Sequence, residues 1–302
     1  MGYVDFILNL AGLLLWLNWR SLRFDPLVKR PPATLMGTLR PAAPDRLSRW
    51  HFLVAIAILL LLRAVFYWLI GSALKWSGKL DFQVVVFWFS CGSKWAGLLN
   101  MVAFSFLSFG LTLWVCYVVL LFLSLLSGSE PVNRLVTIPL GRVYAWPTWV
   151  KLSLPFVLSA VAWWVLSWVL GWLQIIPPPI SAMHRIEQSV VIGLESYLIW
   201  KLPMAAILIL HLLNSYIYFG KHPFWKYISE AAQKLLQPLR RIPLRLGRVD
   251  FAPILGIVLV FLCTSFIENG FQTAVRHGPR HEQLRPLIQI PGLVEIYKRL
   301  PL

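Results

Sequence analysis

The sequence predicts an all-α protein, a polytopic helical membrane protein with about six transmembrane helices, and three observations support this fold class. The chain is 58% hydrophobic and only 13% charged, whereas soluble domains are closer to half apolar and a quarter charged. Several apolar runs are long enough to cross a bilayer. A short Gly-Arg-Val pattern occurs twice, each time before a long apolar run.

A helix that crosses a bilayer needs about 20 mostly apolar residues. Five runs meet this requirement: residues 51–74, 96–126, 148–176, 190–220 and 251–267. A sixth run, residues 3–19, contains Asn9 and Asn18, so it could either span the membrane or lie in the interface. The apolar stretch 82–89 is too short to span. We expect it at the membrane surface or folded back on the helix bundle.

The repeated pattern predicts two related halves. The first copy begins with Gly141 and Arg142 and ends at Pro147; the second begins at Gly247 and ends at Pro253. In each copy the pattern stands between two apolar runs. Two spans per copy return the chain to its starting side, so the sequence predicts two parallel helix-loop-helix repeats.

These repeats divide the chain into four parts. Proline cannot continue a helix, and three consecutive prolines at 177–179 mark a stiff spacer between the repeats. The predicted parts are an N-terminal extension with one or two membrane helices, a first repeat, a second repeat, and an extramembrane C-terminal tail, at residues 1–94, 95–176, 186–268 and 269–302.

The net charge of +16 indicates an orientation in the membrane. Most of the 28 Lys and Arg residues lie in the connections 20–50, 127–151 and 221–250. Positive residues accumulate on the cytoplasmic side of membrane proteins, so both motif loops are predicted to be cytoplasmic. Because the basic residues separate apolar runs and form no long tracts with exposed aromatics, we expect no nucleic-acid partner.

The second motif loop combines an amphipathic helix with a cluster of arginines. Residues 223–239 have a helical apolar period with basic residues on the opposite face, and Pro238 weakens or ends the helix. Gly247 is predicted to form a turn, and Asp250 to cap the final span before Pro253 in its first turn. A candidate surface for lipid phosphate or a partner is formed by Arg240, Arg241, Arg245 and Arg248. The alternative is that this loop only caps and anchors its helices.

Four polar residues within apolar runs are further candidates: Arg63, Glu195, Lys201 and His211. A charge inside the membrane usually faces a partner or a cavity. Arg63 therefore marks either an ion or substrate path or a structural residue, which would extend its charge to the membrane surface or form a pair, with Glu195 as a candidate partner. His211 is predicted to be a buried histidine bonded to a neighbouring helix, or alternatively a haem ligand.

No catalytic or metal-binding pattern is recognisable in the sequence. Walker, Gly-x-Ser-x-Gly, His-Glu-x-x-His and Cys-x-x-Cys-His motifs are missing, and Cys91, Cys116 and Cys263 form no Cys-x-x-Cys pair. The sequence therefore predicts a protein that is not an enzyme and that holds no cofactor or metal, unless His211 binds haem or a pigment.

Three segments of the second half resemble the signature of the YggT family of small integral membrane proteins. They begin at His222-Pro223-Phe224-Trp225, at Leu235-Leu236-Gln237-Pro238, and at Gly247-Arg248-Val249-Asp250. The close resemblance covers about residues 223–262, and residues 130–156 are a diverged copy. The resemblance implies a multi-pass protein of the bacterial inner membrane, with links to osmotic stress, cell division, nucleoid organisation and assembly of plastid cytochrome complexes. It implies no catalytic residues.

Two functions follow from these observations. The first is a non-enzymatic membrane scaffold, assembly factor or accessory subunit, whose basic cytoplasmic loop contacts anionic lipid or a partner. Its partners would be membrane lipids and either other membrane subunits or further copies of the chain. The alternative is a homo-oligomeric channel or transporter linked to osmotic stress, which would use Arg63 and Glu195.

Overall fold

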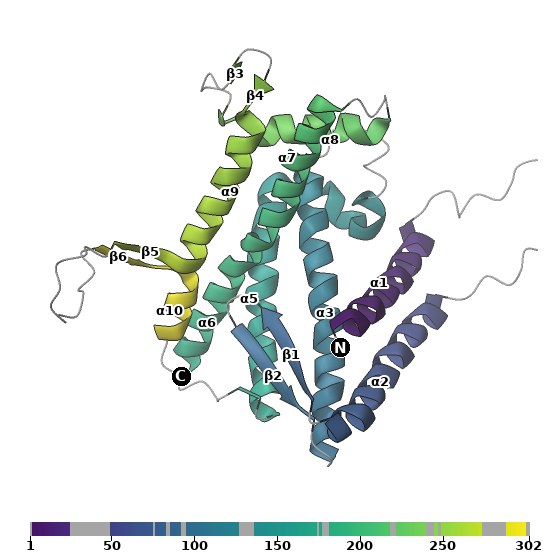
Figure 1. Ribbon diagram of the computed structural model, residues 1–302. Coiled ribbons are helices and arrows are strands. Elements are labelled where there is room, and N and C mark those ends of the chain that lie inside the picture. Colours follow the sequence, from purple (N-terminus) through teal and green to yellow (C-terminus); the bar gives the residue numbers. More distant parts are fainter. Residues whose placement is uncertain are drawn as a thin grey trace, which may run out of the picture. The chain divides into compact units, whose positions relative to one another are not determined.

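The structure is a computed structural model that describes residues 2–24, 49–74, 76–82, 85–91, 95–126, 136–173, 175–176, 181–217, 222–239, 245–246, 249–273 and 288–299 (Figure 1). Within these residues, six helical stretches are long and apolar enough to cross a membrane. The predicted fold class, a polytopic helical membrane protein, is therefore confirmed.

The membrane-length helices follow the predicted runs closely. They are α1 (Gly2–Phe24), α2 (Arg49–Leu74), α3 (Trp95–Leu126), α5 (Thr148–Trp172), a stretch interrupted by a 3₁₀ turn, and α9 (Ala252–Asn269). The interrupted stretch consists of α6 (Ala182–Glu195), η4 (Ser196–Trp200) and α7 (Lys201–Tyr216). Two shorter helices, α8 (Pro223–Leu235) and α10 (Leu293–Arg299), are also labelled in Figure 1.

The chain forms two compact units. Unit 1 comprises Met1–Leu80, Phe87–Leu121 and Arg134–Ala145, and unit 2 comprises Asp81–Val86, Phe122–Asn133 and Trp146–Leu302. The helix α3 therefore contributes its first part to unit 1 and its last turn to unit 2. The predicted repeat boundaries remain a prediction, because these units are defined by packing and not by sequence similarity.

In unit 1, α1 lies antiparallel along α2. Asp5, early in α1, contacts Arg63 and Tyr67 late in α2, while Leu15 and Trp16 pack on a cluster that includes Ile56 and Leu60 of α2 and Phe109 of α3. The helix α1 has 23 residues, which is long enough to cross a bilayer beside α2. This favours the spanning alternative for residues 3–19.

Close packing of α1 on α3 depends on a glycine. A Cβ atom added at Gly12 would lie 2.6 Å from Cε2 of Phe109, which is too short for any real contact. Because the side chain of Gly12 is a single hydrogen atom, the two helices can approach each other closely. Asn9 of α1 and Ser108 of α3 are hydrogen-bonded at the same interface, with 3.1 Å between Nδ2 and Oγ.

Two strands, whose residues are divided between the two units, were not predicted. The strands β1 (Ser77–Phe82) and β2 (Val85–Ser90) form a two-stranded sheet. Phe89 is buried and its ring lies 5.6 Å from that of Phe104 on α3, so this segment folds back on the bundle as expected. The sequence prediction missed its conformation because the apolar run 82–89 lacks the alternation of a half-buried strand.

In unit 2, α5 packs on α6 and α7 packs on α9. Gly193 of α6 allows the close approach to α5, because a Cβ atom there would lie 2.8 Å from Cδ2 of Phe156. The C-terminal strands β5 (Gly270–Thr273) and β6 (Ile288–Pro291) pair in antiparallel fashion and lead into α10. Leu293 of α10 is buried with Val191 and Leu198, so α10 covers part of α6.

The two motif copies differ at their helix starts. Gly141 has a φ of 58° and begins the 3₁₀ helix η3 (Gly141–Ala145), a conformation that favours glycine. Pro147 is the N-cap residue of α5, and Arg142 is exposed. In the second copy, β3 (Arg245–Leu246) pairs with β4 (Val249–Asp250).

The prediction that Asp250 caps the final span is wrong. The N-cap residue of α9 is Phe251, which makes no side-chain capping bond. The physical reason is the short β3–β4 ladder, which pairs Asp250 with Arg245 and so places Asp250 in a strand before the helix begins. Pro253 lies in the first turn of α9 and is buried, where its missing N–H is tolerated.

Candidate functional site: a polar cluster around Arg63

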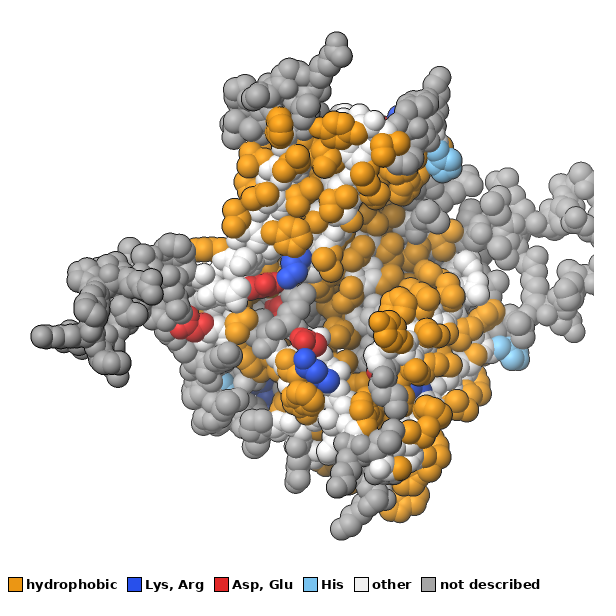
Figure 2. All heavy atoms as spheres, viewed as in Figure 1, with side chains coloured by type: hydrophobic (Ala, Val, Ile, Leu, Met, Phe, Trp, Pro, Cys, Tyr) orange, Lys and Arg blue, Asp and Glu red, His pale blue; other side chains and the backbone are white. Residues whose placement is uncertain are grey.

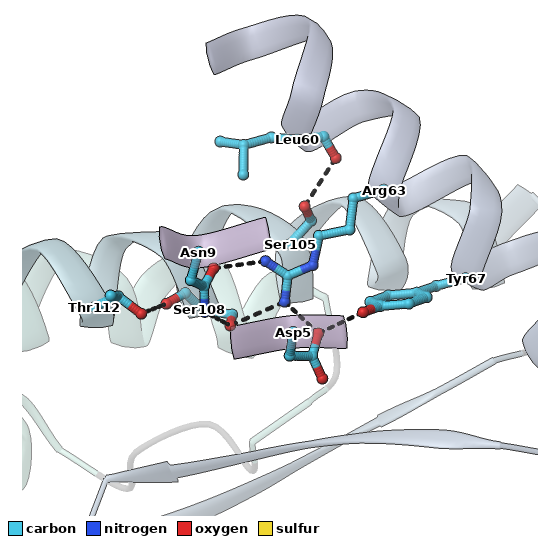
Figure 3. Close-up of polar contacts among 8 residues, drawn as sticks. All are labelled: Asp5, Asn9, Leu60, Arg63, Tyr67, Ser105, Ser108 and Thr112. Atoms are coloured by element: carbon cyan, nitrogen blue, oxygen red, sulfur yellow. Dashed lines mark hydrogen bonds and ion pairs between the residues drawn. The ribbon is translucent and has the colours of Figure 1, made fainter. Parts of the chain in front are cut away.

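The strongest candidate site is a group of polar side chains buried among the three helices of unit 1. Its centre is Arg63 of α2, whose side chain is 0% exposed. A buried guanidinium is costly unless it is neutralised and its N–H groups are hydrogen-bonded. The contacts of Arg63 therefore determine what this cluster can do (Figure 3).

Asp5 of α1 neutralises this charge. Its Oδ1 lies 2.5 Å from Nη2 of Arg63 and also accepts a hydrogen bond from the hydroxyl of Tyr67 at 2.6 Å. Arg63 and Tyr67 are four residues apart on α2, so both side chains lie on the same face of that helix. The side chain of Asp5 is 21% exposed, so the acidic end of the pair is the accessible one.

The remaining contacts connect Arg63 to α1 and α3. Nη1 of Arg63 donates to Oδ1 of Asn9 at 2.7 Å, and Nη2 donates to Oγ of Ser108 at 3.1 Å. The hydroxyl of Ser105 donates to the Leu60 carbonyl of α2 at 2.8 Å. Polar groups that hydrogen-bond across helices in this way fix helix pairs in a membrane.

Aromatic rings enclose the guanidinium. Its Cζ lies 5.5 Å from the ring centroids of both Tyr67 and Phe104, within the range of a cation–π interaction. Phe104 also contacts Trp76 and Phe89. Of the three guanidinium nitrogens of Arg63, Nε has no hydrogen-bond partner among the described residues. We call Asp5, Asn9, Arg63, Tyr67 and Ser108 the polar clasp.

The predicted pairing of Arg63 with Glu195 is wrong. Arg63 pairs with Asp5 in unit 1, whereas Glu195 is a buried residue of α6 in unit 2. Sequence analysis missed Asp5 because it lies in the most polar of the apolar runs, 58 residues from Arg63. One signal was present: Asp5 and Asn9 are spaced as i and i+4, the same spacing as Arg63 and Tyr67.

The other intramembrane candidates, Glu195, Lys201 and His211, lie in unit 2. Lys201 at the start of α7 forms an ion pair with Glu268 near the end of α9. Glu195 lies close enough to Tyr297 of α10 for its charge to act on the phenol. Burial and, secondarily, this charge raise the pKa of Tyr297 from 10.0 to about 12.

His211 on α7, the histidine that the sequence indicated, is partly buried, and its Nδ1 atom is buried. A second histidine is buried more deeply. His184 on α6 is 4% exposed, and its Nε2 lies 2.9 Å from Nε2 of Gln188. Among the described residues there is no group of three or more His, Cys, Asp or Glu side chains that could hold a metal ion.

Most of the basic loop lies outside the described residues. This holds for Arg240, Arg241, Gly247 and Arg248, whereas Arg245 is described only as part of the strand β3. Pro238 is exposed just after α8.

The helix α8, which precedes the loop, is confirmed as an amphipathic helix beginning at Pro223, but its apolar face is buried by protein. Tyr227, Ile228, Ala231 and Ala232 are all buried. The Tyr227 hydroxyl donates to the carbonyl of Leu123, and Nζ of Lys234 to that of Leu126, each at 3.3 Å. Both bonds go to backbone carbonyl groups in the last turn of α3 and hold α8 against that turn.

The comparisons with known proteins support the predicted family. The CCB3/YggT family model matches residues 190–271, which extend from α6 through α9 to β5. No curated protein and no solved structure matches the chain significantly. The family match confirms the resemblance found in the second motif copy; the first copy and the polar clasp lie outside the matched residues.

Proposed function

Because residues 190–271 carry the CCB3/YggT domain, we propose that this membrane protein is a non-enzymatic scaffold, assembly factor or accessory subunit of a membrane protein complex. Its contact sites would be the exposed faces of its membrane helices and the basic loop at 240–248. In this proposal the protein lies in the bacterial inner membrane, and both motif loops face the cytoplasm.

The observation that carries the proposal is that the intramembrane arginine is engaged in holding the protein's own helices. Nη1 and Nη2 of Arg63 are occupied by Asp5, Asn9 and Ser108, and aromatic rings cover the guanidinium. An arginine that serves an ion or substrate path would instead face a water-filled cavity. This use of Arg63 favours a structural role over transport.

The exposed surface of the described helices suits contacts with other membrane segments. Figure 2 shows that hydrophobic side chains cover much of the described surface in that view, with few charged ones between them. Large aromatic side chains are exposed along α5: Trp149, Trp164, Trp168 and Trp172. Tryptophan offers a large apolar area with a polar N–H group, which suits both interfaces and membrane boundaries.

The position of α8 supports a role for the basic loop in contacts at the membrane surface. The helix is packed on unit 2 through its apolar face, so it is not free to insert that face into lipid. Its exposed side chains, together with the arginines that follow in sequence, would then act through charge. Arginine clusters recognise phosphate and carboxylate groups by bidentate hydrogen bonds.

A charge-neutralising variant tests this proposal. We expect Arg240→Gln, Arg241→Gln and Arg245→Gln in one chain to lower binding to vesicles that contain anionic lipid, and to reduce copurification of partner subunits, while the helical content stays the same. The matched control carries Arg276→Gln, Arg280→Gln and Arg285→Gln in the C-terminal tail, with the same change in net charge. Equal binding by the two triple variants would contradict the proposal.

The alternative, a homo-oligomeric channel or transporter linked to osmotic stress, is favoured by one observation. The carboxylate of Asp5 is partly exposed while the guanidinium that it neutralises is buried in a candidate span. Solute flux in liposomes that contain only this protein would support the channel. Flux that is unchanged by Arg63→Leu would remove Arg63 from its mechanism.

A further inference from the structure

The helix α1 is the least apolar of the six candidate membrane spans in the described part of the chain. It contains Asp5 and Asn9, and an acidic side chain in a membrane helix opposes insertion. The neighbouring helix α2 is very apolar but contains Arg63, which carries its own penalty. Each helix alone therefore bears a polar group that disfavours its place in the bilayer.

The polar groups that disfavour insertion of α1 and α2 are complementary to each other in charge and hydrogen bonding. Arg63 directs its guanidinium at Asp5 and Asn9, which lie on one face of α1 (Figure 3). The pair is neutral overall, and both terminal nitrogens of the Arg63 guanidinium are hydrogen-bonded within the polar clasp. Farther along the same interface, Leu15 and Trp16 pack with Ile56 and Leu60. The polar contacts and the apolar contacts therefore require the same alignment of α1 along α2.

We propose that the polar clasp is a topological lock: α1 crosses the membrane because Arg63 receives Asp5 and Asn9, and not because α1 is hydrophobic enough to insert by itself. Ser108 extends the lock to α3 by bonding both Arg63 and Asn9. The lock fixes the side of the membrane on which the N-terminus lies, and it concerns residues outside the family match.

The lock reverses the usual expectation for removing a charge from a membrane helix. If hydrophobicity alone governed insertion, Arg63→Leu would make α2 more apolar and leave α1 unaffected or better inserted. If the lock governs it, Arg63→Leu removes the partner of Asp5 and Asn9, so α1 loses its place beside α2. The two explanations therefore predict opposite results for the same substitution.

The experiment measures the orientation of α1 with single cysteines in the full-length chain. Cys91, Cys116 and Cys263 are replaced by serine, and one reporter cysteine is placed at Gly2 or at Ala42. An added Cβ atom at Gly2 has no neighbouring atom within 4 Å, so this reporter does not disturb packing. A membrane-impermeant maleimide is applied from each side of the membrane, using intact cells and inverted vesicles.

The lock predicts that the two reporters are labelled from opposite sides in the unmodified background. In the Arg63→Leu variant the two reporters should no longer be labelled from opposite sides, because the Gly2→Cys reporter is no longer labelled from its original side. The compensating variant Asp5→Leu, Asn9→Leu, Arg63→Leu should restore opposite-side labelling, because it removes both charged groups and the Asn9 amide, so that neither charge is left without its partner. Lys201→Leu, which removes a charge from unit 2, is the matched control and should leave both reporters unchanged.

Opposite-side labelling that persists in Arg63→Leu would overturn the proposal. The proposal can still be tested if Arg63→Leu fails to accumulate in the membrane. In that case the compensating variant must accumulate and must be labelled like the unmodified background. If the compensating variant is as defective as Arg63→Leu, the polar clasp does not set the topology. Binding of lipid or partner subunits by the basic loop is measured separately, so either proposal can fail while the other stands.

Discussion

The two units each contain an ion pair between membrane helices, but the pairs differ in their surroundings. In unit 1, Arg63 is fully buried and its pair with Asp5 is supported by Tyr67, Asn9 and Ser108. In unit 2, Lys201 and Glu268 are 22% and 23% exposed, respectively, and sit at the ends of their helices. Burial and hydrogen bonding thus distinguish the two pairs, although their charges are alike.

This difference indicates which ion pair contributes more to the stability of its unit. A buried charge that loses its partner keeps its full desolvation cost, whereas a partly exposed charge regains contact with water or headgroups. Lysine also has a long flexible side chain that can extend to the membrane surface. We therefore expect unit 1 to depend strongly on its pair and unit 2 to depend weakly on its own.

Asp5→Ala should have the largest effect. It leaves the guanidinium of Arg63 buried without its counter-charge, and such a loss typically costs about 3–5 kcal/mol. Denaturant-induced unfolding in mild detergent measures the change. A loss close to zero would mean that Arg63 reaches water or another acceptor, and would remove the contrast between the two units.

Gly12→Ala should have the next largest effect. The added methyl group would meet the ring of Phe109 at 2.6 Å, and such overpacking typically costs about 1–3 kcal/mol. Gly110→Ala is a matched control on α3, because a Cβ atom there meets no atom within 4 Å. If both variants unfold alike, α1 does not pack on α3 as closely as described.

Glu268→Ala should have a smaller effect than either. The pair that it breaks is partly exposed at both ends, and pairs in contact with water contribute about 0–1 kcal/mol. The same unfolding measurement applies, with Lys201→Gln as the companion variant. A loss as large as that of Asp5→Ala would show that the exposure of the pair does not determine its contribution.

Ionisation of Tyr297 should leave the stability of the protein unchanged at neutral pH and lower it in alkali. Burial and the charge of Glu195 raise its pKa from 10.0 in the unfolded chain to about 12. The phenol therefore stabilises the docked α10 fully below pH 10, and this contribution is lost as the pH rises toward about 12. Tyr297→Phe should remove this loss, as followed by alkaline unfolding. An identical alkaline transition in both proteins would place Tyr297 in water.

The membrane helices could be predicted from the sequence because each of the five long apolar runs is an independent signal. The start of α8 was predicted for the same reason, since Pro223 and the helical period of its apolar residues are local features. The interruption at Ser196–Trp200 was not predicted, although Pro203 follows it and lacks the N–H that would bond the carbonyl of Ile199.

The polar clasp could be predicted only in part, because pairing between distant residues leaves little local trace. Arg63 was identified as a costly charge, but its partner was assigned to Glu195 on the basis of sequence alone. The cap at Asp250 was predicted from helix-capping preference, and the short hairpin that pairs Arg245 with Asp250 overrode it. The first error comes from an interaction between distant segments, and the second from a competing local structure.

The most direct test of the proposed function is the native mass of the protein, extracted from its own membrane in mild detergent, with mass spectrometry of the chains that accompany it. We predict a particle that contains other membrane proteins and that loses them in the Arg240→Gln, Arg241→Gln, Arg245→Gln variant but not in the tail control. A homogeneous particle of this chain alone, which conducts solute in liposomes, would contradict the scaffold and establish the channel.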